Sequence, residues 1–350
     1  MSLSRSGPWL DVGLQLEPSW PEINARAARH RDVAGVAIGN GDSVHLFTRN
    51  DAQVLVYGRD GNLTQTFGQG LFTMPHAIEV DPEGCIYCVD NGDHTVRKFS
   101  PTGELLLTLG TPDVGSDTGW RALSTAEIEI SAVEAVQYAG PPFNGCTDVA
   151  IGDQGDIYVS DGYRNCQIHR FAPSGDLIQS WGGVGTGGGE FHLPHCVVVD
   201  GERLLVADRE NDRVQVFDLD GGHLETWTGF QRPTDVAVDP SSGRIFVTEL
   251  PRPLGNRGFL SDTRDRHQAG RVSVLDPAGN VLVRWGREPN GDMDGYFIAP
   301  HTVAVDSVGT VYVGEVTYTF GIKPGYVGQE YSEHQLQRFR AVPGATPLGR

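Results

Sequence analysis

The stretch CTDVAIGDQGDIYVSDGYRNCQIHRFAPSGDLIQSWGG, residues 146–183, contains four short runs rich in Val, Ile, Phe and Tyr. Gly, Asp, Asn or Pro separates each run from the next, which is typical of β-strands joined by tight turns. The same order returns from residue 195, where HCVVVD is followed by RLLVADREN, DRVQVFD and HLETWTG. Four strands in this order make one propeller blade, so the sequence predicts an all-β fold built of repeated blades.

The opening strand of this unit occurs six times, and one slot near its start is occupied in turn by Ala34, His76, Thr147, His195, Thr234 and His301. The spacings are 42, 71, 48, 39 and 67 residues. Propeller repeats run at about 40–50 residues, so the two long intervals contain insertions, at about 110–143 and 250–270. We therefore expect a single six-bladed propeller domain over residues 1–350. The insertions either cover a functional site or decorate the surface, and part of 121–137 is compatible with a short helix.

The last unit lacks a fourth strand. Its three predicted strands lie at 301–306, 310–315 and 334–340, and only AVPGATPLGR follows. The segment up to Trp20 precedes the first unit and has no blade of its own. We expect residues within 8–20 to supply the missing strand, because this would close the ring and remove two exposed sheet edges.

Composition narrows the range of partners. There are 45 acidic and 27 basic residues, which gives a net charge of −18. Nucleic acids and anionic membranes both require a basic face, so neither is expected as a partner. No apolar run reaches the roughly 18 residues of a membrane-spanning helix. The N-terminus lacks the charged start and apolar core of a signal peptide, and we expect a cytoplasmic protein.

The five cysteines are too few and too irregular for a disulfide framework. Cys85 and Cys88 have the spacing of a metal-binding pair, but they lie in a strand pattern that turns them to opposite faces, and no second pair follows. Cys146 and Cys166 flank adjacent predicted strands, a position compatible with a disulfide between them, although reduced thiols are the rule inside cells.

Histidine occupies the slot in alternate units only. The three segments read MPHAIEVD at His76, LPHCVVVD at His195 and APHTVAVD at His301. Alternate blades of a six-bladed ring lie about 120° apart, so three imidazoles would converge on the ring axis and form a three-histidine site for a catalytic metal such as Zn²⁺. The alternative, that Pro-His merely suits this strand start, is disfavoured by the units that have Thr-Asp or Ala-Gly. The other histidines are not expected to bind metal; His192, His45, His169 and His267 lack suitable spacing.

These segments resemble NHL-repeat propellers and, more specifically, the catalytic core of peptidyl-α-hydroxyglycine α-amidating lyases. The resemblance is sharpest over 143–217 and extends to LFTMPHAIEVD and IAPHTVAVDSVGTVYVGE. It implies that the three slot histidines bind the catalytic zinc. It also implies that Tyr163 in SDGY, Arg209 in ADREN and Arg49 in HLFTRN are active-site residues, the two arginines suiting a substrate carboxylate.

The resemblance implies cleavage of the C–N bond of a carbinolamide to give an amide and an aldehyde. Zinc would bind the substrate hydroxyl and lower its pKa. A tyrosine hydroxyl becomes a workable base only beside cations, which zinc and either Arg209 or Arg49 would supply. The alternatives without a catalytic role are a channel-lining position for Tyr163, a salt bridge of Arg209 with Asp208 or Glu210, and a surface position for Arg49.

Several positions depart from the family pattern. The family's disulfide cysteines near the tyrosine fall on other residues here, including Arg164. The family has Met two residues before the third zinc histidine, where it lines the substrate pocket, and here that residue is Ala299. The family has Asp directly after that histidine as a ligand of a structural Ca²⁺, and here that residue is Thr302. The chain also has no copper hydroxylase half. We therefore expect a small-molecule or short peptidyl substrate. The competing hypotheses are a metal-dependent hydrolase or hydratase and a non-catalytic NHL propeller scaffold.

Overall fold

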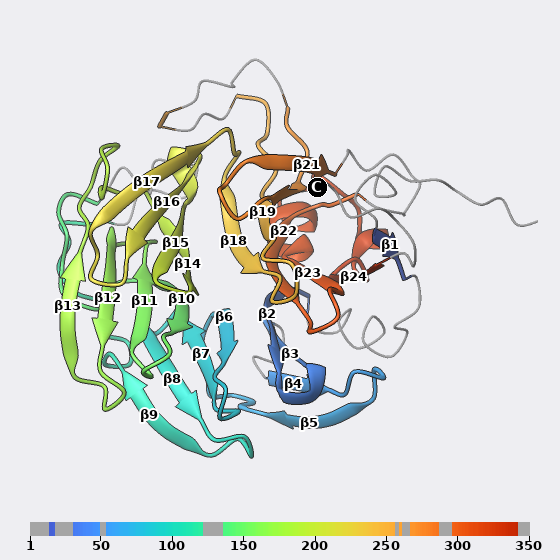
Figure 1. The fold of residues 1–350 in the computed structure, drawn as a ribbon, viewed down its shortest axis with the longest axis horizontal. Helices are drawn as coiled ribbons and strands as arrows, with labels where there is room; N and C mark the ends of the chain where they lie inside the picture. The colour runs from blue at the N-terminus through green and yellow to red at the C-terminus, as the bar shows by residue number, and fades with distance from the viewer. Residues whose placement is uncertain are drawn as a thin grey trace, which may run out of the picture.

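A computed structural model gives the fold and describes residues 14–17, 31–49, 54–121, 136–255, 259–260, 267–286 and 296–341. Six four-stranded antiparallel sheets are arranged as blades around a central axis (Figure 1). The predicted six-bladed, all-β propeller is thus confirmed. The predicted helix within 121–137 lies almost wholly outside the described residues. Among the described residues, none forms a helix long and apolar enough to cross a membrane.

Each of the first three blades runs outward in chain order from an inner strand. Blade 1 comprises β2 (Val33–Gly39), β3 (Ser43–Thr48), β4 (Val54–Tyr57) and β5 (Leu63–Phe67). Blade 2 comprises β6 (Pro75–Val80), β7 (Ile86–Asp90), β8 (Thr95–Phe99) and β9 (Leu105–Leu109). Blade 3 comprises β10 (Cys146–Ile151), β11 (Ile157–Asp161), β12 (Gln167–Phe171) and β13 (Leu177–Trp181).

The next two blades repeat this order. Blade 4 comprises β14 (Pro194–Asp200), β15 (Arg203–Asp208), β16 (Arg213–Asp218) and β17 (His223–Thr228). Blade 5 comprises β18 (Pro233–Val238), β19 (Ile245–Glu249), β20 (Arg271–Leu275) and β21 (Val281–Trp285). Short helical turns lie between strands or beside the last blade: η2 (Asn40–Asp42), η3 (Arg209–Asn211), η4 (Tyr318–Ile322) and η5 (Gln329–Tyr331).

Blade 6 is closed by the other end of the chain. It consists of β22 (Pro300–Val305), β23 (Val311–Glu315), β24 (Leu336–Ala341) and, as its outer strand, β1 (Leu14–Leu16). β1 pairs antiparallel with β24, with Leu14 opposite Ala341 and Leu16 opposite Phe339. The expected strand exchange is therefore confirmed for the described part of segment 8–20.

The hydrophobic core is divided into layers between neighbouring blades. The cluster between blades 5 and 6, for example, includes Leu14, Val272, Trp285 and Val313. Blades 2–6 also share a buried acidic residue at the end of the second strand: Asp90, Asp161, Asp208, Glu249 and Glu315. Each accepts backbone N–H donors from the segment that enters its own blade's inner strand. These acids fix the loops at the channel mouth, where the slot residues lie.

Candidate active site

The slot residues lie where the inner strands bulge. In all six blades the pairing of the first and second strands shifts register at the slot, between Pro75 and Ala77 in blade 2 and between Pro300 and Thr302 in blade 6. A bulge adds one residue and locally changes the direction of side chains. In blades 2, 3, 5 and 6 the slot residue and the next residue both line the central channel, as His76 and Ala77 do.

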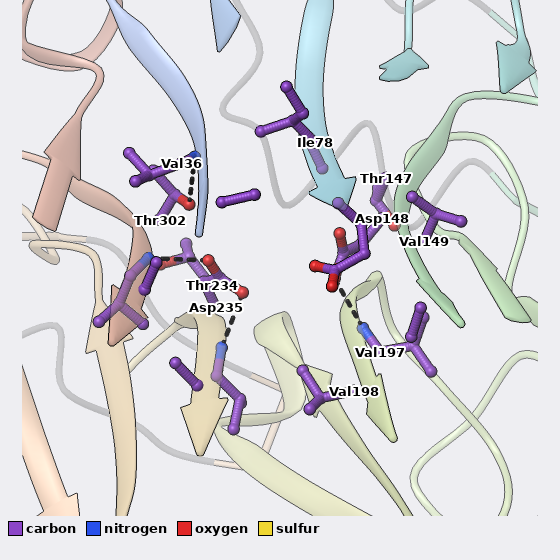
Figure 2. A pocket seen from close by; sticks show the side chains of 18 of the residues that line it. Val36, Ile78, Thr147, Asp148, Val149, Val197, Val198, Thr234, Asp235 and Thr302 are labelled. Atoms are coloured by element: carbon purple, nitrogen blue, oxygen red, sulfur yellow. Dashed lines mark hydrogen bonds between the residues drawn. The ribbon is translucent and has the colours of Figure 1, made fainter. Parts of the chain in front are cut away.

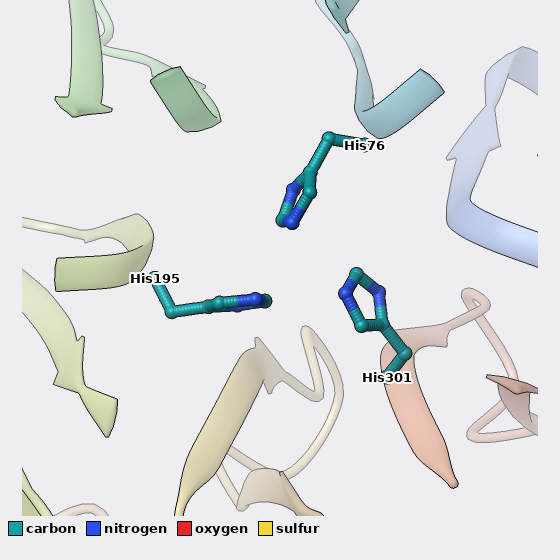
Figure 3. A group of neighbouring side chains, drawn as sticks. All are labelled: His76, His195 and His301. Carbon is teal, nitrogen blue, oxygen red and sulfur yellow. The ribbon is translucent and has the colours of Figure 1, made fainter. Parts of the chain in front are cut away.

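The structure brings the three slot histidines together from alternate blades. His76, His195 and His301 point toward one another from β6, β14 and β22 (Figure 3). Their ring centroids are 4.7 Å, 4.9 Å and 5.0 Å apart. One ligand nitrogen from each lies within 4.8 Å of the other two. The convergence of the three histidines from alternate blades, which the sequence predicted, is what the fold produces.

Backbone carbonyls of the intervening blades set the orientation of these rings. The Nδ1 atom of His76 lies 2.5 Å from the Thr147 carbonyl oxygen. His195 makes the same bond to Thr234 at 2.7 Å, and His301 to Ala34 at 2.9 Å. A carbonyl oxygen only accepts, so each Nδ1 carries the hydrogen and each Nε2 presents a lone pair.

Burial keeps the three rings neutral. Each is at most 3% exposed. Burial is the main cause that holds all three histidine pKa values well below 6.5. The next cause is the charge of a neighbouring imidazole for His76 and His195, and the charge of Arg49 for His301. His301 Nε2 has no hydrogen-bond partner among the described residues. Three neutral imidazoles that direct lone pairs toward one point, each oriented by a carbonyl, fit the donor set of a three-histidine Zn²⁺ site.

Tyr163 lies against this group. Its hydroxyl is 3.2 Å from His76 Nε2 and 3.4 Å from His195 Nε2. Because both nitrogens are acceptors, the hydroxyl donates its one hydrogen to one of them, and His76 Nε2 is the nearer. Arg209 NH1 in turn donates to the Tyr163 hydroxyl at 3.3 Å. The tyrosine oxygen is therefore placed between the imidazoles and a guanidinium group.

Both predicted arginines lie near the histidines. Arg209 is fully buried and also donates from Nε to Glu210 at 2.8 Å, so the salt bridge coexists with the hydrogen bond to Tyr163. Arg49 donates from Nε to the Pro75 carbonyl at 3.0 Å, and its NH1 is 3.6 Å from Asp32. Arg49 is thus bonded to the residue that precedes His76.

The remaining predicted residues are placed as follows. Ala299 is fully buried in an apolar cluster with Ala34, Leu250 and Val316. His192 stands apart from the three slot histidines; it bonds to Asn211 at 3.1 Å and stacks on Phe259 at 3.6 Å. The five cysteines are free thiols.

A second convergent group lies one residue further along the inner strands. One ligand atom each of Asp148, Cys196 and Asp235 lies within 4.8 Å of the other two. The two carboxylates face the channel beside a cavity of about 260 Å³ (Figure 2). Burial, with the proximity of Asp235, raises the pKa of Asp148 well above its ordinary value. This group was not predicted from the sequence, where its signal is the Thr-Asp pair in both threonine-bearing units.

Comparison with known proteins gives a match to a repeat family and matches to individual relatives. The NHL repeat family matches residues 143–171 and 191–217. Peptidyl-alpha-hydroxyglycine alpha-amidating lyase 1 of Drosophila melanogaster is 33% identical over 73% of this chain and 45% of its own length. Peptidylglycine alpha-amidating monooxygenase of Rattus norvegicus is 28% identical over 88% of this chain. The chain spans only 32% of that relative.

Two further matches bear on the fold and on the competing hypotheses. NHL repeat-containing protein 3 of Homo sapiens is 28% identical over 78% of this chain and 73% of its own length. Among solved structures, virginiamycin B lyase from Staphylococcus aureus superposes with a TM-score of 0.55 at 11% identity. That match covers 93% of this chain and 98% of the other, and at this identity it supports the propeller fold alone.

Proposed function

We propose that this NHL-repeat propeller, a homologue of the peptidyl-alpha-hydroxyglycine alpha-amidating lyases, is a zinc-dependent carbon–nitrogen lyase that acts on a carbinolamide. The observation that carries the proposal is the meeting of three neutral imidazoles with the Tyr163 hydroxyl, 3.2 Å from His76 Nε2. His76, His195 and His301 would hold the ion. When bound, zinc supplies a Lewis acid that lowers the pKa of a substrate hydroxyl.

The reaction needs one proton to move from oxygen to nitrogen. As the C–N bond breaks, the carbinol carbon becomes a carbonyl, the hydroxyl proton leaves, and the amide nitrogen gains a proton. Tyr163 would carry that proton, and its hydroxyl, 3.2 Å from His76 Nε2 and 3.4 Å from His195 Nε2, supports this role. Arg209 donates to the same hydroxyl and would stabilise negative charge on it.

The two arginines also suit the anionic end of such a substrate. A carbinolamide derived from an acylated glycine has a carboxylate next to the reacting carbon. Arg49 and Arg209 both lower the pKa of His76 and His301, so their charges act directly at the site. Guanidinium groups bind carboxylates through paired hydrogen bonds, and we assign substrate binding to these two residues.

The proposal is tested with purified protein and α-hydroxyhippurate. A lyase releases benzamide and glyoxylate in equal amounts, and a hydrolase cleaving the amide releases benzoate. The metal content of the same preparation, measured by elemental analysis, separates both enzymes from a scaffold. Benzoate in place of benzamide would favour the hydrolase. Absence of bound metal and of either product would favour the non-catalytic scaffold.

A further inference from the structure

Arg209 belongs to a buried group of charges on and around η3. Two acids of this segment, Glu210 and Asp212, face three arginines: Arg209, Arg232 and Arg252. Arg209 and Arg252 are fully buried, and Glu210 is 2% exposed. Burying this many charges is costly unless each is paired with good geometry. The arrangement therefore calls for an explanation beyond stability.

Glu210 binds two of the three arginines with one carboxylate oxygen. Its Oε1 accepts from Arg209 Nε at 2.8 Å and from Arg232 NH2 at 3.0 Å. Burial alone would raise the Glu210 pKa, but Arg232 and then Arg209 outweigh it and hold that pKa at about 2. Glu210 is therefore an anion at any ordinary pH. It also separates two guanidinium groups that would otherwise repel each other.

The hydrogen bond from Nε fixes which edge of Arg209 faces the site. Arg209 has five N–H donors in a rigid plane, and Glu210 occupies the Nε donor. The plane is thereby oriented so that NH1 lies 3.3 Å from the Tyr163 hydroxyl. The guanidinium carbon lies 5.4 Å from the centre of the Tyr163 ring.

The second insertion holds Glu210 in place. The Glu210 carbonyl accepts from the Phe259 N–H at 2.9 Å, and the Glu210 N–H donates to the His192 carbonyl at 3.1 Å. The Phe259 ring stacks on the His192 ring. At the base of the insertion, Arg252 NH2 donates to Asp212 at 2.5 Å. The backbone of η3 is thus fixed from two sides.

We propose that Glu210 is a positioning residue for Arg209, orienting its guanidinium group toward Tyr163 and the substrate carboxylate. The inference rests on the proposed function, because it assigns Glu210 a role through Arg209. It also gives the 250–270 insertion a purpose: its described residues fix the segment that carries Arg209 and Glu210.

A double-mutant cycle tests this role. Glu210→Gln removes the charge while keeping the size, and we expect turnover of α-hydroxyhippurate to fall by roughly 10–100-fold with KM changed much less. Added to Arg209→Ala, the same substitution should cost almost nothing more, because its effect acts through Arg209. If the loss in the double variant equals the product of the two single losses, the positioning role is overturned.

The matched control is Asp93→Asn. Asp93 is also buried and paired with an arginine, Arg97, but it lies in blade 2 and has no contact with Arg209 among its described bonds. A purely structural effect of losing a buried ion pair would appear in Asp93→Asn as well. We expect that control to retain wild-type kcat and KM.

A structural measurement separates this inference from the proposed function. Glu210→Leu combined with Arg232→Met removes the ion pair between these two residues and, with it, the carboxylate that accepts from Arg209 Nε. Crystal structures of this variant and the wild type should show Arg209 NH1 no longer within hydrogen-bond distance of the Tyr163 hydroxyl. An unmoved Arg209 would overturn the inference whatever the activity. Failure of the wild type to release glyoxylate would refute the lyase function, and the two crystal structures would still decide the role of Glu210.

Discussion

Each imidazole is held by the blade that follows it around the ring. His76 bonds to Thr147, His195 to Thr234, and His301 to Ala34 across the closure of the ring. The blades without histidine therefore have a function of their own, because they orient the histidines of their neighbours. Alternation along the sequence indicated where the histidines converge. The orienting bonds come from backbone carbonyls, which leave no mark in the sequence, so they could not be predicted.

Threonine and alanine in the intervening slots are also not equivalent. Thr147 donates its hydroxyl to the Pro194 carbonyl at 2.8 Å, and Thr234 makes the matching bond to Pro300 at 3.2 Å. Ala34 has no hydroxyl, and the corresponding carbonyl, that of Pro75, accepts from Arg49 Nε. The unit with Ala in its slot is thus the unit in which an arginine enters the site.

The first prediction concerns metal binding. Replacing His76, His195 or His301 by Ala should abolish tight binding of about one zinc ion per chain, because each supplies one of three converging nitrogens. His192→Ala should keep the metal, since His192 bonds to Asn211 and stacks on Phe259. Elemental analysis of the four variants checks this. Unchanged zinc in all three slot variants would refute the assigned ligands.

The second prediction concerns the tyrosine. Tyr163→Phe removes only the hydroxyl that lies between His76, His195 and Arg209. Turnover of α-hydroxyhippurate should fall by roughly 10²–10⁴-fold if the hydroxyl carries the proton. Zinc content and the thermal midpoint should stay at wild-type values, because the ring remains in place. Near-full turnover in this variant would mean that Tyr163 only lines the channel.

At the scale of elements, the inner strands decide what faces the channel. A strict alternation would turn the residue after each slot away from the axis. The bulge at the threonine slots brings Asp148 and Asp235 back to the channel wall, and one ligand atom of each lies within 4.8 Å of the Cys196 thiol. The strands and the slot are predictable from the sequence. The bulge is not, because one extra residue in a short strand leaves the apolar pattern almost unchanged. This is why the second group of side chains was missed.

The third prediction uses Glu79, which lines the same channel on β6. Burial, and after it the charge of Asp235, raises the Glu79 pKa from 4.5 to about 8. A carboxyl whose pKa is raised by folding binds more protons in the folded state, so it lowers stability as pH rises from 4.5 through 8. Glu79→Gln should therefore stabilise the protein by about 2 kcal/mol at pH 8 and have almost no effect near pH 4. This free energy is smaller than the pKa shift alone implies, because Glu79 is partly exposed and solvent screens its charge.

Urea unfolding of wild type and Glu79→Gln at both pH values measures this difference. Glu104→Gln is the control, because Glu104 is exposed and lies outside the channel. A wild type more stable than Glu79→Gln at pH 8 would show that the carboxylate is ionised and paired with a positive charge in the channel, contrary to the expectation.

At the scale of the whole molecule, the sequence predicts the fold more completely than it predicts the candidate site. Repeated four-strand units and their spacing predicted six blades, and the missing last strand predicted closure by the N-terminal segment. These features are periodic, and every repeat adds to the signal. The contacts of Arg209 depend instead on one irregular insertion and on side chains from three segments, among them Glu210 and Arg232. These contacts do not recur from blade to blade, so the sequence indicated Arg209 but not the orientation of its guanidinium group.

The fourth prediction concerns closure of the ring by β1. Leu14 is 6% exposed and packs in the core between blades 5 and 6, and Glu17 forms ion pairs with Arg338 and Arg340 on β24. Deleting residues 1–20 should remove about 3 kcal/mol of stability, lower the thermal midpoint by roughly 5 °C, and expose the edge of β24. The control is deletion of residues 1–13, which keeps β1 and should melt like the full chain. Calorimetry and light scattering measure both effects. If the longer deletion melts and elutes like the shorter one, β1 does not close the ring in solution.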